Sequence, residues 1–212
     1  MPPTARFVCS FAAEPPQDGL PYGRWSDRLR VEFLGACLRI EDEGEDLGEA
    51  GDIVWFPDRS YGGRTYIPAS TRTTTGFELY GHVSFVPAGD DESDPSDFVA
   101  TADFTAETAE ANPDWRLDLC EDVIGKWRGE HGNVAAMTLV WGRPLVSGGV
   151  IATAELADLA VDQCELDDGR FTLVAPDAYR GDILDIKLFD TRGHELARES
   201  LYEDDAGDDE EG

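Results

Sequence analysis

Three histidines are the residues of this sequence best suited to acid–base chemistry, and they stand far apart. His82, His131 and His194 are separated by at least 49 residues. An enzyme usually brings together a nucleophile, a base and an orienting group, or metal ligands at a recognisable spacing. No Gly-x-Ser-x-Gly, phosphate loop, dinucleotide fingerprint or His-Glu-x-x-His occurs. We therefore expect each histidine to be structural, and the sequence predicts a protein that is not an enzyme.

An acidic run offers the oxygen ligands that calcium prefers. It lacks the Asp-x-Asp-x-Asp-Gly order of an EF-hand, so a solvated loop is the main expectation and a calcium site is the alternative. No other cofactor is indicated. The candidate ligands are Asp90, Asp91, Glu92, Asp94 and Asp97.

The four cysteines, Cys9, Cys37, Cys120 and Cys164, are widely separated and form no Cys-x-x-Cys pair. Cys9 and Cys37 lie in apolar runs, where an unpaired cysteine behaves as a small hydrophobic residue. We expect buried free thiols, with disulfides or metal binding as the alternatives.

The net charge of −28 is concentrated in three stretches without Lys or Arg. Residues 41–52 hold seven acids, 90–97 hold five and 203–212 hold seven. Such a chain repels nucleic acids and anionic membranes, so both are excluded as expected partners, and a basic protein surface is the expected one. Two alternatives remain open: the charge serves solubility alone, or it reflects a halophilic host.

No apolar stretch approaches the roughly 20 residues that a membrane-spanning helix needs, and no signal-peptide core is recognisable. The sequence therefore predicts a cytoplasmic protein.

Two segments resemble each other in the order and spacing of their turn residues. Residues 51–58 end in Pro57-Asp58, and residues 169–177 end in Pro176-Asp177. Each then reaches a Gly-x-Glu-Leu, at 76–79 and at 193–196. This order predicts an internal repeat, in which residues 53–79 superpose on 171–196 and the two prolines occupy equivalent turns.

Strand-like runs recur about every ten residues between Gly and Pro, which is typical of an all-β sandwich or barrel. They include 6–12 and 28–38. We expect a tandem or pseudo-duplicated antiparallel β-sandwich, with immunoglobulin-like architecture as a guess. The expected units are a first sandwich at 1–87, an acidic connector with short helical elements (105–111 and 119–127) at 88–130, a second sandwich at 131–203, and a disordered acidic tail at 204–212.

Gly125-Lys126-Trp127-Arg128-Gly129 resembles the Gly-x-Trp opening of lipocalin-like and nitrobindin-like barrels, which implies a tryptophan that closes a barrel floor. In those families the motif lies near the N-terminus. Here only some 75 foldable residues follow it, too few for a ligand-holding barrel. We therefore assign no family and expect Trp127 to pack in an interdomain core.

Together these features predict a non-catalytic protein-interaction module whose acidic loops contact a basic partner. A small-ligand- or calcium-binding β protein is the alternative.

Overall fold

The structure is a computed structural model that describes residues 22–42, 44–88, 94–128, 134–177 and 183–201. These residues form one helix and twelve strands, so the protein is mostly β, as the sequence predicts. In chain order the elements are α1 (Tyr22–Cys37), β1 (Ala50–Trp55), β2 (Arg59–Tyr61), β3 (Arg64–Thr73), β4 (Glu78–Val86), β5 (Ser96–Thr105), β6 (Leu117–Arg128), β7 (Val134–Pro144), β8 (Ile151–Leu156), β9 (Leu159–Glu165), β10 (Phe171–Asp177), β11 (Asp185–Phe189) and β12 (Glu195–Ser200).

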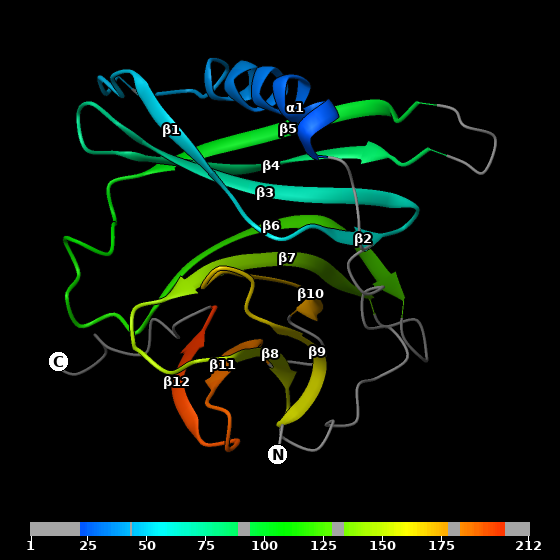
Figure 1. Cartoon of the computed structure of the whole chain (residues 1–212), viewed down its shortest axis with the longest axis vertical. Helices are drawn as coiled ribbons and strands as arrows, with labels where there is room; N and C mark the ends of the chain where they lie inside the picture. The colour runs from blue at the N-terminus through cyan, green and yellow to red at the C-terminus, as the bar shows by residue number, and fades with distance from the viewer. Residues whose placement is uncertain (1–21, 43, 89–93, 129–133, 178–182, 202–212) are drawn as a thin grey trace, which may run out of the picture.

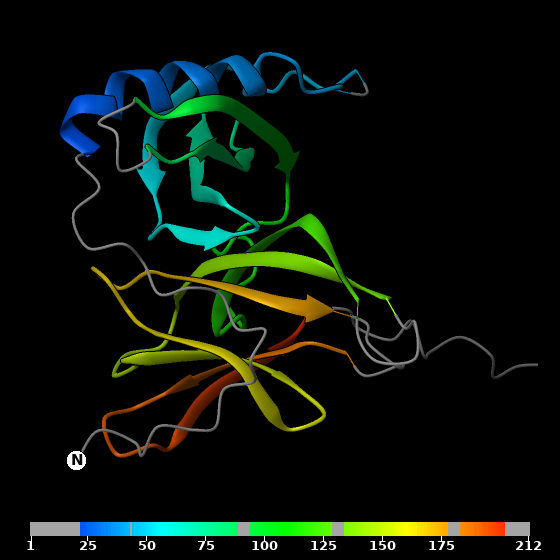
Figure 2. The same cartoon turned by 90° about the vertical axis from the view of Figure 1, so that its right-hand side faces the viewer.

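The strands form three antiparallel sheets. The first sheet has the order β1-β3-β4-β5, with β2 beside β3; the second is β10-β7-β6 and the third is β12-β11-β8-β9. Figures 1 and 2 show the layers stacked in the order α1, first sheet, second sheet, third sheet. Within the described residues no helix is long and apolar enough to span a membrane.

Helix α1 covers the outer face of the first sheet. The sequence predicts a strand at residues 28–38, most of which belong to this helix. That expectation is wrong. Leu29, Phe33 and Ala36 follow one another at helical spacing and are buried. Leu29 and Phe33 share a cluster with Ile67 and other residues of β3 and β4, so packing against the sheet selects the helix.

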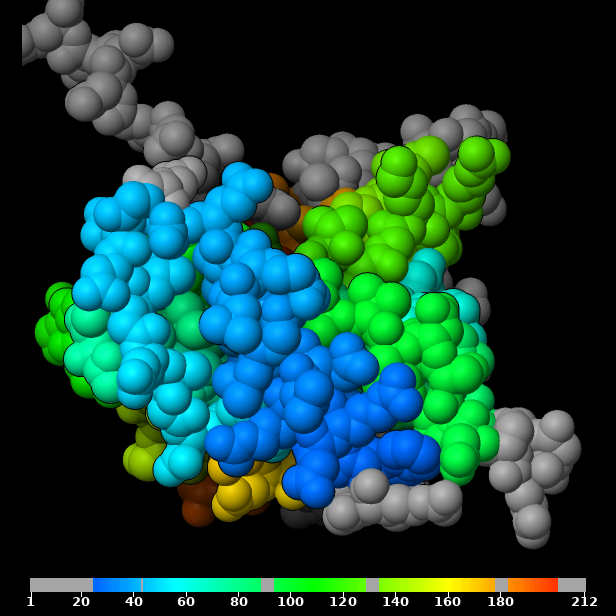
Figure 3. All heavy atoms as spheres, turned by 90° about the horizontal axis from the view of Figure 1, so that it is seen from above, coloured from blue at the N-terminus to red at the C-terminus, as the bar shows by residue number. Residues whose placement is uncertain are grey.

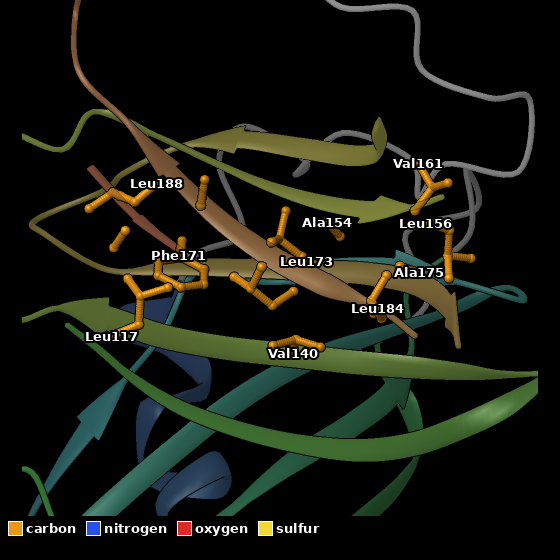
Figure 4. Close-up of a cluster of buried hydrophobic side chains, with 13 residues drawn as sticks. Leu117, Val140, Ala154, Leu156, Val161, Phe171, Leu173, Ala175, Leu184 and Leu188 are labelled. Carbon is orange, nitrogen blue, oxygen red and sulfur yellow. The ribbon is translucent and has the colours of Figure 1, made fainter. Parts of the chain in front are cut away.

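The second and third sheets enclose the largest apolar cluster between them (Figure 4). Phe171 and Leu173 of β10 face Ile186 and Leu188 of β11 across this cluster, and all four are fully buried. A second apolar cluster lies between the first and second sheets and consists of Phe56, Tyr66, Met137, Leu139, Trp141 and Val174. Trp127 packs against this second cluster.

Arg59 on β2 ties the first sheet to the other two. Its side chain is 3% exposed, and its Nε donates a hydrogen bond to the Thr172 carbonyl at 2.8 Å. Its Nη2 donates to the Gln163 carbonyl at 3.2 Å and lies 3.5 Å from the Asp162 carboxylate. One buried guanidinium therefore reaches strands from all three sheets.

The strand pairing contradicts the predicted internal repeat. β1 pairs with β3 inside the first sheet, whereas β10 pairs with β7 in the second sheet. Pro57 follows the end of β1, but Pro176 lies within β10 opposite Met137. β10 is an edge strand of its sheet and so tolerates a proline. Similar turn residues recur here in two different topological contexts.

The predicted helical elements of the connector are also wrong. Residues 119–127 belong to the twelve-residue strand β6, and residues 105–111 are the end of β5 followed by a bend and a turn. β6 lies between two apolar clusters: Leu117 faces one, while Cys120 and Ile124 face the other. Apolar residues on both faces of a strand imitate the spacing of a helical face. The predicted strand at 6–12 and the predicted tail at 204–212 lie outside the described residues.

Candidate functional site

Ionisable side chains gather where β4 of the first sheet lies against β6 of the second. Val83 and Phe85 of β4 pack beneath α1, so alternate residues of this strand point towards the second sheet. We call the resulting row of facing residues the seam. It consists of Glu78, Tyr80 and His82 from β4 and of Asp118, Cys120 and Asp122 from β6.

A buried histidine, His82, is the centre of a polar network in the seam. The residue is 5% exposed, and its Nδ1 lies 3.0 Å from Oγ1 of Thr101 on β5 and 3.2 Å from Oδ2 of Asp122 on β6. The Thr101 hydroxyl donates to the same Asp122 oxygen at 2.9 Å. The Tyr66 ring lies 5.4 Å from the imidazole, so the three polar groups meet beside an aromatic wall.

This network differs from a nucleophile–base–acid triad. In a triad the acid holds one ring nitrogen while the other nitrogen accepts the proton of the nucleophile. Here Thr101 and Asp122 both contact Nδ1 of His82, and the Thr101 hydroxyl points its proton at the carboxylate. The geometry links three strands from two sheets.

Asp122 is held ionised by its neighbours. Burial acts to raise its pKa, but the hydrogen bond and charge of His82 oppose that effect, aided by the Thr101 hydroxyl and the Val123 N–H. The pKa of Asp122 is therefore lowered. The carboxylate acts as the acceptor that joins the first and second sheets.

The other end of the seam favours protonated groups. Burial, followed by the charge of Asp118, raises the pKa of Glu78 above its ordinary value, against the opposing effects of a Ser70 hydrogen bond and two arginines. Burial raises the pKa of the Cys120 thiol well above its usual range and that of Tyr80 to about 12. A thiol that stays protonated is a poor nucleophile.

Cys37, Cys120 and Cys164 are free thiols, but each residue is partly buried rather than fully buried as expected, and Cys9 lies outside the described residues. Burial raises the pKa of Cys37 and of Cys164 to about 11. All three thiols are therefore suited to packing.

The two remaining histidines stand apart from the seam. His194 Nδ1 lies 3.1 Å from Oδ2 of Asp190 in the turn between β11 and β12. Asp190 also accepts hydrogen bonds from the N–H groups of Arg192 and His194, so it organises that turn. His131 lies outside the described residues.

The acidic loop at 41–52, whose last three residues begin β1, carries exposed acids on a backbone held by hydrogen bonds. Asp42 accepts a hydrogen bond from the Gly44 N–H at 3.0 Å, and Asp46 accepts one from the Gly48 N–H at 3.1 Å. The turn between β3 and β4 holds the end of the loop: Thr75 donates to the Leu47 carbonyl, while Thr74 and Glu49 exchange two further hydrogen bonds. The exposed acids are Glu41, Asp42, Glu45, Asp46, Glu49 and Asp52.

The structure divides the calcium candidates. Asp90, Asp91 and Glu92 lie outside the described residues, whereas Asp94 and Asp97 lie just before or within β5. Arg64 binds both the carboxylate and the backbone carbonyl of Asp97, so an arginine already neutralises this candidate. Within the described part of the chain, no three His, Cys, Asp or Glu side chains are grouped as metal ligands.

No protein-family model, curated protein or solved structure matches this chain. The functional argument therefore rests on the geometry of the described residues.

Proposed function

We propose that this protein is a non-catalytic interaction module that binds a basic protein partner through the acidic loop at 41–52. The observation that carries the proposal is the combination of charge and order in this loop. Six exposed carboxylates sit on a backbone tied to the first sheet by Thr74 and Thr75.

The carboxylates of the loop are available to Lys or Arg side chains of another protein. Among the described residues, no ion pair joins any of these six carboxylates to a Lys or Arg of the same chain. A loop already held in place loses less conformational entropy on binding than a mobile one. Clustered negative charge also speeds the approach of a basic partner, in a way that salt weakens.

Two finer expectations accompany the proposal: an immunoglobulin-like architecture and a cytoplasmic location. Neither bears on the partner, because fold by itself does not define function.

Titration with an oligolysine peptide at low and at high salt tests the proposal. Wild-type protein should bind at low salt and lose most of its affinity at high salt. A variant with Glu41→Gln, Asp42→Asn, Glu45→Gln and Asp46→Asn should bind at least ten-fold more weakly (roughly 1.4 kcal/mol). Asparagine keeps an oxygen that can accept the turn hydrogen bonds of the two aspartates.

A control variant removes the same number of exposed acids elsewhere, through Glu107→Gln, Asp114→Asn, Glu165→Gln and Asp167→Asn. It should bind almost as well as the wild type. Equal losses of affinity in the two variants would mean that only the net charge of the protein matters and not the position of the acids. The solubility alternative would then replace this proposal.

A further inference from the structure

Strand β5 leaves one edge of the first sheet open. Among the described residues it pairs with β4 alone, and at ten residues it is nearly twice the usual strand length. Charged side chains and prolines commonly keep an edge strand from pairing with another chain. The central residues 98–102 of β5 contain neither. Figure 3 shows green atoms, the colour of β5, exposed beside the blue helix α1.

Side-chain contacts reveal which backbone groups of β5 point away from β4. Arg39 Nη2 lies 3.5 Å from the Ala100 carbonyl, and Asp103 accepts a hydrogen bond from the Phe104 N–H at 2.8 Å. The Val99 carbonyl instead accepts a bond from a side chain of β4. Backbone direction alternates along a strand. The residues with outward N–H and C=O groups are therefore Ala100, Ala102 and Phe104; before Val99 a bulge, with a positive φ at Asp97, interrupts the alternation.

Arg39 and Asp103 each form a hydrogen bond with a backbone group of β5 that the backbone of an added strand would otherwise bind. The guanidinium supplies a donor to an outward carbonyl, and the carboxylate supplies an acceptor to an outward N–H. Both side chains are exposed, so a partner's backbone can displace them at small cost.

We propose that β5 pairs antiparallel with β5 of a second copy, about a two-fold axis through Thr101, so that two first sheets become one continuous sheet. This register places Ala100 opposite Ala102 of the partner subunit, so that outward groups bond to outward groups.

Charge disfavours one of the two neighbouring registers. Val99 faces the partner's Asp103, and no carboxylate of β5 lies directly opposite another. Moving the two-fold axis from Thr101 to Ala100 would instead bring Asp97 towards the partner's Asp103, a repulsive pair that occurs twice by symmetry. Antiparallel pairing also brings Arg39 of each copy towards Asp103 of the partner subunit, where the two displaced side chains have opposite charge.

The net charge of −28 on each chain opposes association, so salt should strengthen the dimer by screening it. This response has the opposite sign to that of the proposed loop–partner contact, which salt weakens. The two interactions can therefore be distinguished in the same protein.

Sedimentation equilibrium of the full chain at high salt tests the proposal. The expected mass at high concentration is twice the 23.2 kDa of the monomer. Val99→Asp places like charges opposite each other at two symmetric positions and should weaken the dimer about ten-fold. Val99→Lys faces the partner's Asp103 with an opposite charge and should tighten it.

Val134→Asp is the matched control, because Val134 on β7 is 52% exposed and Val99 is 48% exposed. The control makes the same charge change away from the β5 edge and should leave the dimer constant unaltered. A wild type that stays monomeric at all concentrations overturns the proposal. So do equal effects of the two aspartate variants, or a Val99→Lys dimer no tighter than that of the wild type.

Discussion

Lys187 on β11 and Glu155 on β8 form a buried ion pair, with Nζ 2.6 Å from Oε2 and side chains only 4% and 2% exposed. Ile186 and Leu188 flank Lys187 and face the core, so the ammonium lies on the opposite face of the third sheet. Thr153 donates a further hydrogen bond to Glu155 at 3.0 Å. The pair therefore bridges two central strands of this sheet.

Removing one partner of this pair should be costly. Lys187→Met leaves a buried carboxylate without its cation, and we expect a loss of about 3–5 kcal/mol in the free energy of unfolding. The double variant Lys187→Met/Glu155→Gln should be much closer to the wild type, because no charge is left buried. Urea unfolding of both variants measures the difference, and a double variant no more stable than the single one would contradict this account.

The contact of Asp122 with His82 predicts a dependence of stability on pH. The folded-state pKa of Asp122 lies below its ordinary value of 3.8, so folding favours the ionised carboxylate. Its stabilisation is present above the unfolded-state pKa and is lost as the pH falls through the folded-state pKa. Asp122→Asn should therefore cost about 1 kcal/mol at neutral pH and almost nothing in strong acid.

Urea unfolding of wild type and Asp122→Asn across the acid range is the measurement. Asp114→Asn serves as a control, since Asp114 is exposed and lies outside the seam. A constant difference between wild type and Asp122→Asn at every pH would show that the carboxylate charge does not matter.

Two glycines differ in the space available for an added Cβ, and this difference predicts opposite effects of alanine substitution. A Cβ at Gly35 in α1 would meet only Arg39 Nη1 at 3.6 Å, so Gly35→Ala should stabilise the protein by roughly 0.5–1 kcal/mol. A Cβ at Gly81 would lie 2.1 Å from the Thr101 carbonyl oxygen, so Gly81→Ala must push β4 and β5 apart. Thermal melting should therefore move up for the first variant and clearly down for the second. Similar shifts in both would contradict the packing described at Gly81.

Salt and calcium separate the two explanations of the acidic stretches. High salt should raise the melting temperature modestly by screening repulsion among carboxylates. Millimolar calcium should add nothing beyond sodium chloride of matched ionic strength. A calcium-specific rise of several degrees would instead favour a binding site that includes the acidic run at 90–97.

The sequence predicts most of the strand content, because β-branched and aromatic runs between Gly and Pro are a local signal. It fails at α1, where Leu29, Phe33 and Ala36 lie within a run rich enough in Val, Phe and Leu to resemble a strand. There packing against the sheet beneath the helix determines the structure, and the strands of that sheet all come later in the chain, between β1 and β5.

The candidate sites also combine features that the local sequence reveals with features that depend on tertiary contacts. Charge alone reveals the loop at 41–52, whereas its attachment to Thr74 and Thr75 depends on a hairpin further along the chain. The partners of His82 come from two other strands, and strand register brings them together. The acidic residues Asp118 and Asp122 at alternate positions of one strand are the signal that could have pointed to the seam.

Arg59 has a consequence for the order in which the protein can mature during synthesis. Its hydrogen-bond acceptors, the carbonyls of Gln163 and Thr172, lie 104 and 113 residues further along the chain. In a growing chain the Arg59 guanidinium therefore stays in water, and the first sheet cannot be fastened to the other two, until β9 and β10 have left the ribosome. A truncated chain that ends before β9 should be retained by chaperones, even though every strand of the first sheet is already present in it.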